Sequence, residues 1–144
     1  MKITITEAQY QKLLEGNITY APEKIDDFVE EAQQFLNNAR ALKSKYYMNV
    51  TTLNISDVIE NEVAFQKLAE KMDSDHNEIE HKHNRYADIV NMYDFMEEPE
   101  NVKYLGKLSD RIYDISDDIY QLSQALEEIV SSVRYLRRMS DDKK

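Results

Sequence analysis

Apolar residues at alternating spacings of three and four run through residues 105–136 and restrict this stretch to a helix. The ten successive positions are Leu105, Leu108, Ile112, Ile115, Ile119, Leu122, Leu126, Ile129, Val133 and Leu136. This spacing places all ten side chains along one face of an α-helix. Pro99 suits the first turn of a helix, so we predict a helix over residues 99–138. A stripe of this length has to be buried against other helices.

A second periodic segment precedes it. Apolar residues recur every seven positions at Val58, Phe65, Met72, Ile79, Tyr86 and Tyr93. This repeat predicts one helix over residues 56–97, with a break near Asp73 and Ser74 as the alternative. The short turn at "EEPE" (97–100) would join the two long helices as an antiparallel hairpin.

A shorter helix is predicted over residues 22–47, beginning at Pro22. Its stripe consists of Ile25, Phe28, Ala32, Phe35, Ala39, Leu42 and Tyr46. If the chain folds back from a connector at 48–55, Pro22 lies level with residue 80. The distal part of the hairpin would then be uncovered, namely Tyr86, Ile89, Val90, Tyr93, Leu105 and Leu108.

The N-terminal segment, residues 1–21, combines strand-like and helical features. Ile3 and Ile5 alternate with threonines, as in a strand. A Thr-x-x-Gln capping box from Thr6 and a closing Gly16 predict a short helix over 7–15. We expect this helix to cover the distal hairpin. Ile3 and Ile5 would either lie in a groove of the bundle or pair with another chain.

These elements predict a single all-α domain over residues 1–144. It is an elongated antiparallel helical bundle built on a long, coiled-coil-like hairpin, with a short N-terminal strand-like segment and a capped helix. Only two glycines and two prolines occur in 144 residues, which agrees with few turns and long helices. Neither a signal peptide nor a membrane span is expected. We therefore expect a cytoplasmic location, in a bacterium or a virus-infected host, with the virion as an alternative.

Residues that could carry chemistry are few. The chain has no cysteine, which excludes disulfides, zinc–thiolate sites and thiol catalysis. His76, Glu80 and His83 share one helix face and have the residue types that bind zinc. The level-matched positions of helix 99–138 supply no ligand. Packing that sets the helix register, or a pH-sensitive contact, are the alternatives, so we predict no metal, no cofactor and no enzymatic activity.

The formal net charge is −10, which disfavours direct binding to nucleic acid or to anionic membranes. Asp110, Asp114, Asp117 and Asp118 recur along helix 99–138. Carboxylates repeating along a helix can imitate a phosphate backbone toward a basic protein. An inhibitor of a nucleic-acid enzyme is therefore one candidate function, and a solvated acidic face is its plain alternative.

Tyr113 and Tyr120 lie just outside the apolar stripe, seven residues apart. They suit either internal packing or a partner surface, where tyrosine is favoured. The favoured function is non-enzymatic protein–protein interaction or assembly, with a protein partner, self-association or both. A bacterial or bacteriophage accessory or structural component fits this description. The acidic inhibitor is the first alternative, and a metal-binding helical bundle is the second.

Overall fold

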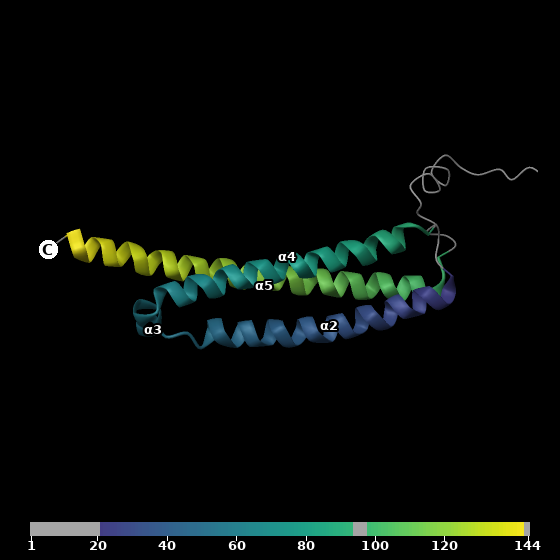
Figure 1. Cartoon of the computed structure of the whole chain (residues 1–144), viewed down its shortest axis with the longest axis horizontal. Coiled ribbons are helices and arrows are strands. Elements are labelled where there is room, and N and C mark those ends of the chain that lie inside the picture. Colours follow the sequence, from purple (N-terminus) through teal and green to yellow (C-terminus); the bar gives the residue numbers. More distant parts are fainter. Residues whose placement is uncertain (1–20, 94–97, 143–144) are drawn as a thin grey trace, which may run out of the picture.

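The computed structural model describes residues 21–93 and 98–142 (Figure 1). Four helices account for nearly all of these residues, and the described part contains no strand. The helices are α2 (Pro22–Thr51), α3 (Ile55–Glu60), α4 (Glu62–Asn91) and α5 (Glu100–Asp142). The predicted strand at Ile3 and Ile5 and the predicted helix 7–15 lie outside the described residues. None of the helices in the described ranges has a stretch long and apolar enough to cross a membrane.

The two long helices pack against each other, which confirms the predicted pairing of α4 with α5. Hydrogen bonds from Ser123 to the carbonyl oxygen of Ala69 and from Ser109 to that of His83 show that the pair is antiparallel. Most of the predicted apolar stripe of α5 is buried, and Leu105, Ile112, Ile119 and Leu126 are fully inaccessible. The hydrophobic core therefore follows the apolar stripe of α5.

The predicted helix over 56–97 is wrong in two respects, because the structure divides it at Asn61 and ends it at Asn91. Asn61 ends α3 and precedes α4 with a non-helical backbone. Its side-chain amide donates a hydrogen bond to the carbonyl oxygen of Asp57. Its own carbonyl accepts the first α4 bond, from Phe65. Asparagine favours such helix boundaries because its side chain can bond to the local backbone. The alternative break near Asp73 and Ser74 is also wrong, since α4 continues through both.

The lengthwise position predicted for α2 is wrong as well. Asn101 donates hydrogen bonds to the carbonyl oxygen of Pro22 and to Asp26, so α2 begins beside the start of α5 rather than level with residue 80. Helix α2 is also longer than predicted and ends at Thr51, so the first residues of the expected connector are helical. The chain does not fold straight back after α2, because α3 and the first turns of α4 project beyond its end.

The uncovered part of the hairpin is consequently at the other end. Tyr86, Ile89, Leu105 and Leu108, which were expected to be uncovered, are buried. An ion pair between Lys43 and Asp118, taken with the bond from Asn101 to Pro22, shows that α2 and α5 run in parallel. Thr51 is therefore about level with residue 126, and α5 continues for roughly 24 Å beyond it at 1.5 Å per residue. In Figure 1 the yellow end of α5 extends past both α2 and α3.

Candidate interaction site

Two histidines of α4 face two serines of α5 in the same arrangement, one heptad apart. Nδ1 of His76 donates a hydrogen bond of 3.0 Å to the carbonyl oxygen of Ser116, and Nδ1 of His83 donates one of 2.9 Å to that of Ser109. Each serine hydroxyl donates in return to the carbonyl oxygen of its histidine, at 3.1 Å. A carbonyl oxygen only accepts, which assigns the proton to Nδ1 in both rings. We call these two pairs the His–Ser ladder.

The ladder bears directly on the proposed metal ligands. Residues seven apart on a helix are separated by about 10.5 Å along its axis, and the two imidazoles are held at different serines. Nε2 of His76 lies 3.7 Å from Glu80. Within residues 21–93 and 98–142, no three histidine, aspartate or glutamate side chains are grouped as a metal site would require. Both histidines instead form hydrogen bonds that pack α4 against α5.

Tyr113 and Tyr120 belong to the same assembly. The Tyr120 ring lies 5.0 Å from the His76 ring, and the Tyr113 ring lies 5.0 Å from the His83 ring, with tilted planes in both pairs. Both tyrosines are nevertheless exposed. Each tyrosine therefore packs one face against a histidine and leaves the rest of its ring open to solvent. This position is compatible both with internal packing and with a partner surface.

The aspartates of α5 do not form one uniform surface. Asp110, Asp114 and Asp117 are exposed. Asp118 is only partly exposed and forms an ion pair of 2.7 Å with Lys43 of α2. Asp117 accepts a hydrogen bond from Gln121. The structure thus separates Asp118, which binds α2, from the other three carboxylates.

Polar bridges connect α2 with α4. Tyr86 donates a hydrogen bond of 2.9 Å to Glu31, which also pairs with Lys82. Burial, and then this hydrogen bond, raise the pKa of the Tyr86 hydroxyl well above its usual value. Burial acts to raise the pKa of Glu31, but the hydrogen bonds from Tyr86 and Lys82 outweigh it, and the net shift is downward.

The second bridge lies near the C-terminal end of α2. Tyr46 donates a hydrogen bond to Asp75, and Lys71 donates to both of them. Burial and then the bond to Asp75 raise the pKa of the Tyr46 hydroxyl. The bonds to Tyr46 and then Asp75 raise that of Lys71. These bridges fix which residues of α2 and α4 lie side by side.

Exposed apolar side chains are concentrated at the end of the bundle that α2 does not reach. Of the eleven large apolar or tyrosine side chains that are exposed in the described part, eight lie at or near this end. They are Tyr47, Met48, Ile55, Ile59, Val63, Tyr135, Leu136 and Met139. Single exposed apolar residues are common, whereas a cluster of them is typical of an interaction site.

Two hollows adjoin at this end. One, of about 320 Å³, is lined by Ile55, Ile59, Val133, Leu136, Arg137 and Ser140. The other, of about 370 Å³, shares Ile59 and Arg137 with it and extends past Val63. We define the end patch as Ile55, Ile59, Val63, Tyr135, Leu136 and Met139.

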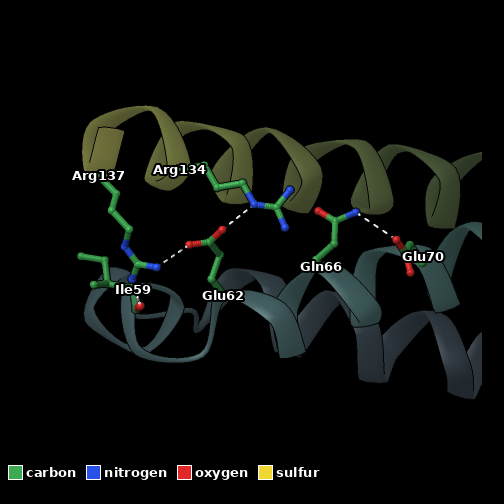
Figure 2. A network of polar contacts seen from close by, with 6 residues as sticks. All are labelled: Ile59, Glu62, Gln66, Glu70, Arg134 and Arg137. Carbon is green, nitrogen blue, oxygen red and sulfur yellow. Dashed lines mark hydrogen bonds and ion pairs between the residues drawn. The ribbon is translucent and has the colours of Figure 1, made fainter. Parts of the chain in front are cut away.

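Two ion pairs and a hydrogen bond connect α3, α4 and α5 beside the end patch. Figure 2 shows Glu62 of α4 between Arg134 and Arg137 of α5. Arg137 lies 2.8 Å from Glu62 and also donates to the carbonyl oxygen of Ile59 in α3. Arg134 and Arg137 therefore connect α5 to α4, and Arg137 also connects it to α3.

Comparisons with known proteins add no assignment, because no family model, curated protein or solved structure matches the chain.

The end patch was missed by sequence reasoning, although one signal was present. The stripe of α5 continues to Leu136 and then Met139, beyond the part of the hairpin that the short helix α2 can cover. Once α2 is placed at the distal end, these residues are necessarily left open.

Proposed function

We propose that this protein acts by binding other protein chains, without chemistry of its own. The observation that supports this proposal is the end patch, whose six side chains are between 41% and 65% exposed. Leaving such side chains in water forgoes about 25 cal/mol for each Å² of apolar surface that a partner could cover. The patch also rests on a fixed base, since Glu62, Arg134 and Arg137 hold the three helices that carry it.

The polar groups of the interior support the same proposal. His76, His83 and their serine partners bond to one another across α4 and α5. In the described part, no buried side-chain nitrogen or oxygen lacks a hydrogen-bond partner. The Nδ1 atoms of both histidines and the two serine hydroxyls are thus used in the packing of α4 on α5.

Affinity capture from a lysate of the source cells tests this function. The full chain is compared with Leu136→Glu, which places a charge in the end patch. Tyr104→Glu is the control, because Tyr104 is 40% exposed on the distal part of the same helix and its replacement adds the same charge. We expect the wild type and the control to enrich the same proteins, and Leu136→Glu to lose them. Enrichment of no protein by the wild type, the chain itself included, would contradict the proposal.

An acidic inhibitor remains the second candidate function. Three exposed carboxylates on one helix, Asp110, Asp114 and Asp117, support it, since such a row can bind a basic protein surface. The corresponding experiment measures binding to a basic nucleic-acid enzyme at low and high salt. The triple replacement of these aspartates by asparagine should abolish salt-sensitive binding, and unchanged binding would contradict this candidate.

A further inference from the structure

The break between α3 and α4 is not required by the local sequence. Asn61 has φ −128° and ψ 41°, outside the helical range, yet residues 55–64 contain neither proline nor glycine. Asparagine is only moderately unfavourable inside a helix. Val58 also keeps the heptad phase of Phe65, so a continuous helix would turn both side chains toward α5. A restraint from elsewhere in the fold therefore causes the break.

The short connector between α2 and α3 supplies this restraint. If α4 continued straight past its first residue, the register of its serine bonds with α5 would carry Ile55 level with Arg137. Thr51 is level with residue 126, about 16 Å short of that position at 1.5 Å per residue, and neighbouring helix axes lie a further 8–10 Å or so apart. The chain from Thr51 to Ile55 reaches at most about 14 Å. A straight helix is thus out of reach, and in Figure 1 α3 lies out of line with α4.

Arg137 occupies a group that a continuous helix would use itself. Its guanidinium donates a hydrogen bond to the carbonyl oxygen of Ile59. In an unbroken α-helix that oxygen would accept from the amide of Val63, four residues further on. The side chain of Asn61 does not cap the first turn of α4, so the broken form leaves leading amides of α4 without a side-chain partner there. Arg137 therefore stabilises the broken form at a carbonyl that the straight form needs.

Little apolar surface fixes α3 in its bent position. Val58 is its one buried residue, while Ile55 and Ile59 are 53% and 46% exposed. The hollow of about 320 Å³ separates these isoleucines from part of α5. Val133 of α5 lines the same hollow and is only 5% exposed. Departure of α3 would uncover Val133 beside Leu136 and lengthen the open apolar stripe.

The last turn of α2 can supply the missing length of chain. Tyr46 is the last buried residue of α2, and in the turn that follows Val50 alone packs, partly buried, against the core. Unwinding residues 48–51 would extend the reach of the connector to about 28 Å. A straight helix would then need roughly 24 Å, measured from the level of Tyr47.

We propose that α3 is a movable cover of the α5 stripe. The short connector and Arg137 hold it bent, and it straightens into line with α4 when the last turn of α2 unwinds. The proposal rests on the interaction function above and supplies its regulation, because the straight form presents the longer apolar stripe. A partner that binds this form shifts the equilibrium toward it.

Double electron–electron resonance measures the straightening directly in the full chain, which has no cysteine of its own. Spin labels are attached at Asp57→Cys and Asn84→Cys, both at exposed positions. A straight helix separates the two backbone positions by about 40 Å, and the bend shortens this distance. We expect six Gly and Ser residues inserted after Thr52 to make the long distance predominant, because the restraint of the connector is then removed.

The role of Arg137 has a matched control in its neighbour. Arg137→Ala should increase the population of the long distance at least threefold. Arg138→Ala removes the same charge from an exposed residue that makes no ion pair within the described ranges, and it should leave the distribution unchanged. Circular dichroism establishes that both variants keep the helix content of the wild type.

Thiol labelling tests the uncovering of α5 separately. Val133→Cys and Val102→Cys each place one thiol at a buried position of α5, the first beside the hollow and the second at the opposite end of the helix. We expect Arg137→Ala to raise the labelling rate of Val133→Cys at least fivefold and to leave that of Val102→Cys unchanged.

A distance distribution that neither the insertion nor Arg137→Ala changes overturns the proposal, as does an equal change with Arg138→Ala. Straightening without faster labelling of Val133→Cys refutes the covering role of α3. The lysate capture reports on the general function independently. A chain that opens as expected but enriches nothing refutes the interaction function, whereas one that enriches proteins with a fixed α3 refutes the movable cover alone.

Discussion

The hydroxyl oxygen of Ser116 lies 2.9 Å from Nδ1 of His76, and it donates to the backbone carbonyl of that same histidine. Ser116 is 1% exposed, so this contact brings the backbones of α4 and α5 close together. The relationship repeats one heptad away between His83 and Ser109. Two serines of α5 thus bond to the α4 backbone at the histidines, one heptad apart.

Replacing Ser116 with alanine should destabilise the protein by about 1 kcal/mol, because the carbonyl oxygen of His76 loses a buried donor. Ser132→Ala, at an exposed position of the same helix, is the control and should change stability by less than about 0.5 kcal/mol. Urea unfolding followed by circular dichroism measures both. Equal effects at the two positions would show that the buried hydrogen bond contributes nothing.

Replacing Gly106 with alanine should stabilise the protein by about 0.5 to 1 kcal/mol, since glycine is unfavourable inside a helix. A Cβ atom at this position would lie 3.7 Å from Val90, which is an ordinary van der Waals contact. The matched reverse change, Ala125→Gly on the same helix, should destabilise by a similar amount. A lower melting temperature for Gly106→Ala would mean that the space beside Val90 is tighter than the structure shows.

Replacing Glu62 with glutamine should destabilise the protein by about 1 to 2 kcal/mol, because Glu62 accepts charge-assisted hydrogen bonds from two arginines. The glutamate side chain is only 15% exposed, but both arginines are partly solvated, which limits the effect. Glu70→Gln, at an exposed position of α4, is the control. The difference should shrink in high salt, and a salt-independent difference would exclude an electrostatic origin.

The stability of the protein should decrease at alkaline pH through its buried tyrosines. Burial and the bond to Glu31 raise the pKa of Tyr86 in the folded protein above its unfolded value of about 10. The stabilisation is therefore complete below about pH 10 and is lost as the pH rises toward the folded pKa. Tyr86→Phe should show a smaller alkaline loss in a series of urea titrations. Tyr135→Phe, at an exposed position, should lose as much as the wild type does.

Addition of zinc should leave the melting temperature unchanged. A ligand that binds only the folded state raises it, but the imidazoles of His76 and His83 are held at separate serines and do not converge on one ion. Differential scanning calorimetry with and without the metal measures this. A zinc-dependent increase that His83→Ala abolishes would contradict the packing role and restore the metal-site hypothesis.

The sequence by itself determined the all-helical class of the described part and the pairing of its two longest helices. Ten aliphatic residues at alternating spacings of three and four leave an α-helix as the arrangement that buries them together, and the heptads of residues 58–93 supply the matching face. His76 and His83 could likewise be placed on one face. Their serine partners could not be identified, because a periodic stripe does not specify which residues of two helices lie level.

Only the tertiary structure decided the lengthwise position of α2 and, with it, the exposed end. A heptad stripe repeats about every 10.5 Å, so several positions along the hairpin bury α2 nearly equally well. Asn61 turns α3 out of line, while the bonds from Tyr86 to Glu31 and from Asn101 to Pro22 select one position. That choice buries the distal hairpin and leaves Leu136 in water. Local pattern fixes what a helix must bury, whereas specific polar contacts between distant residues fix where the burial stops.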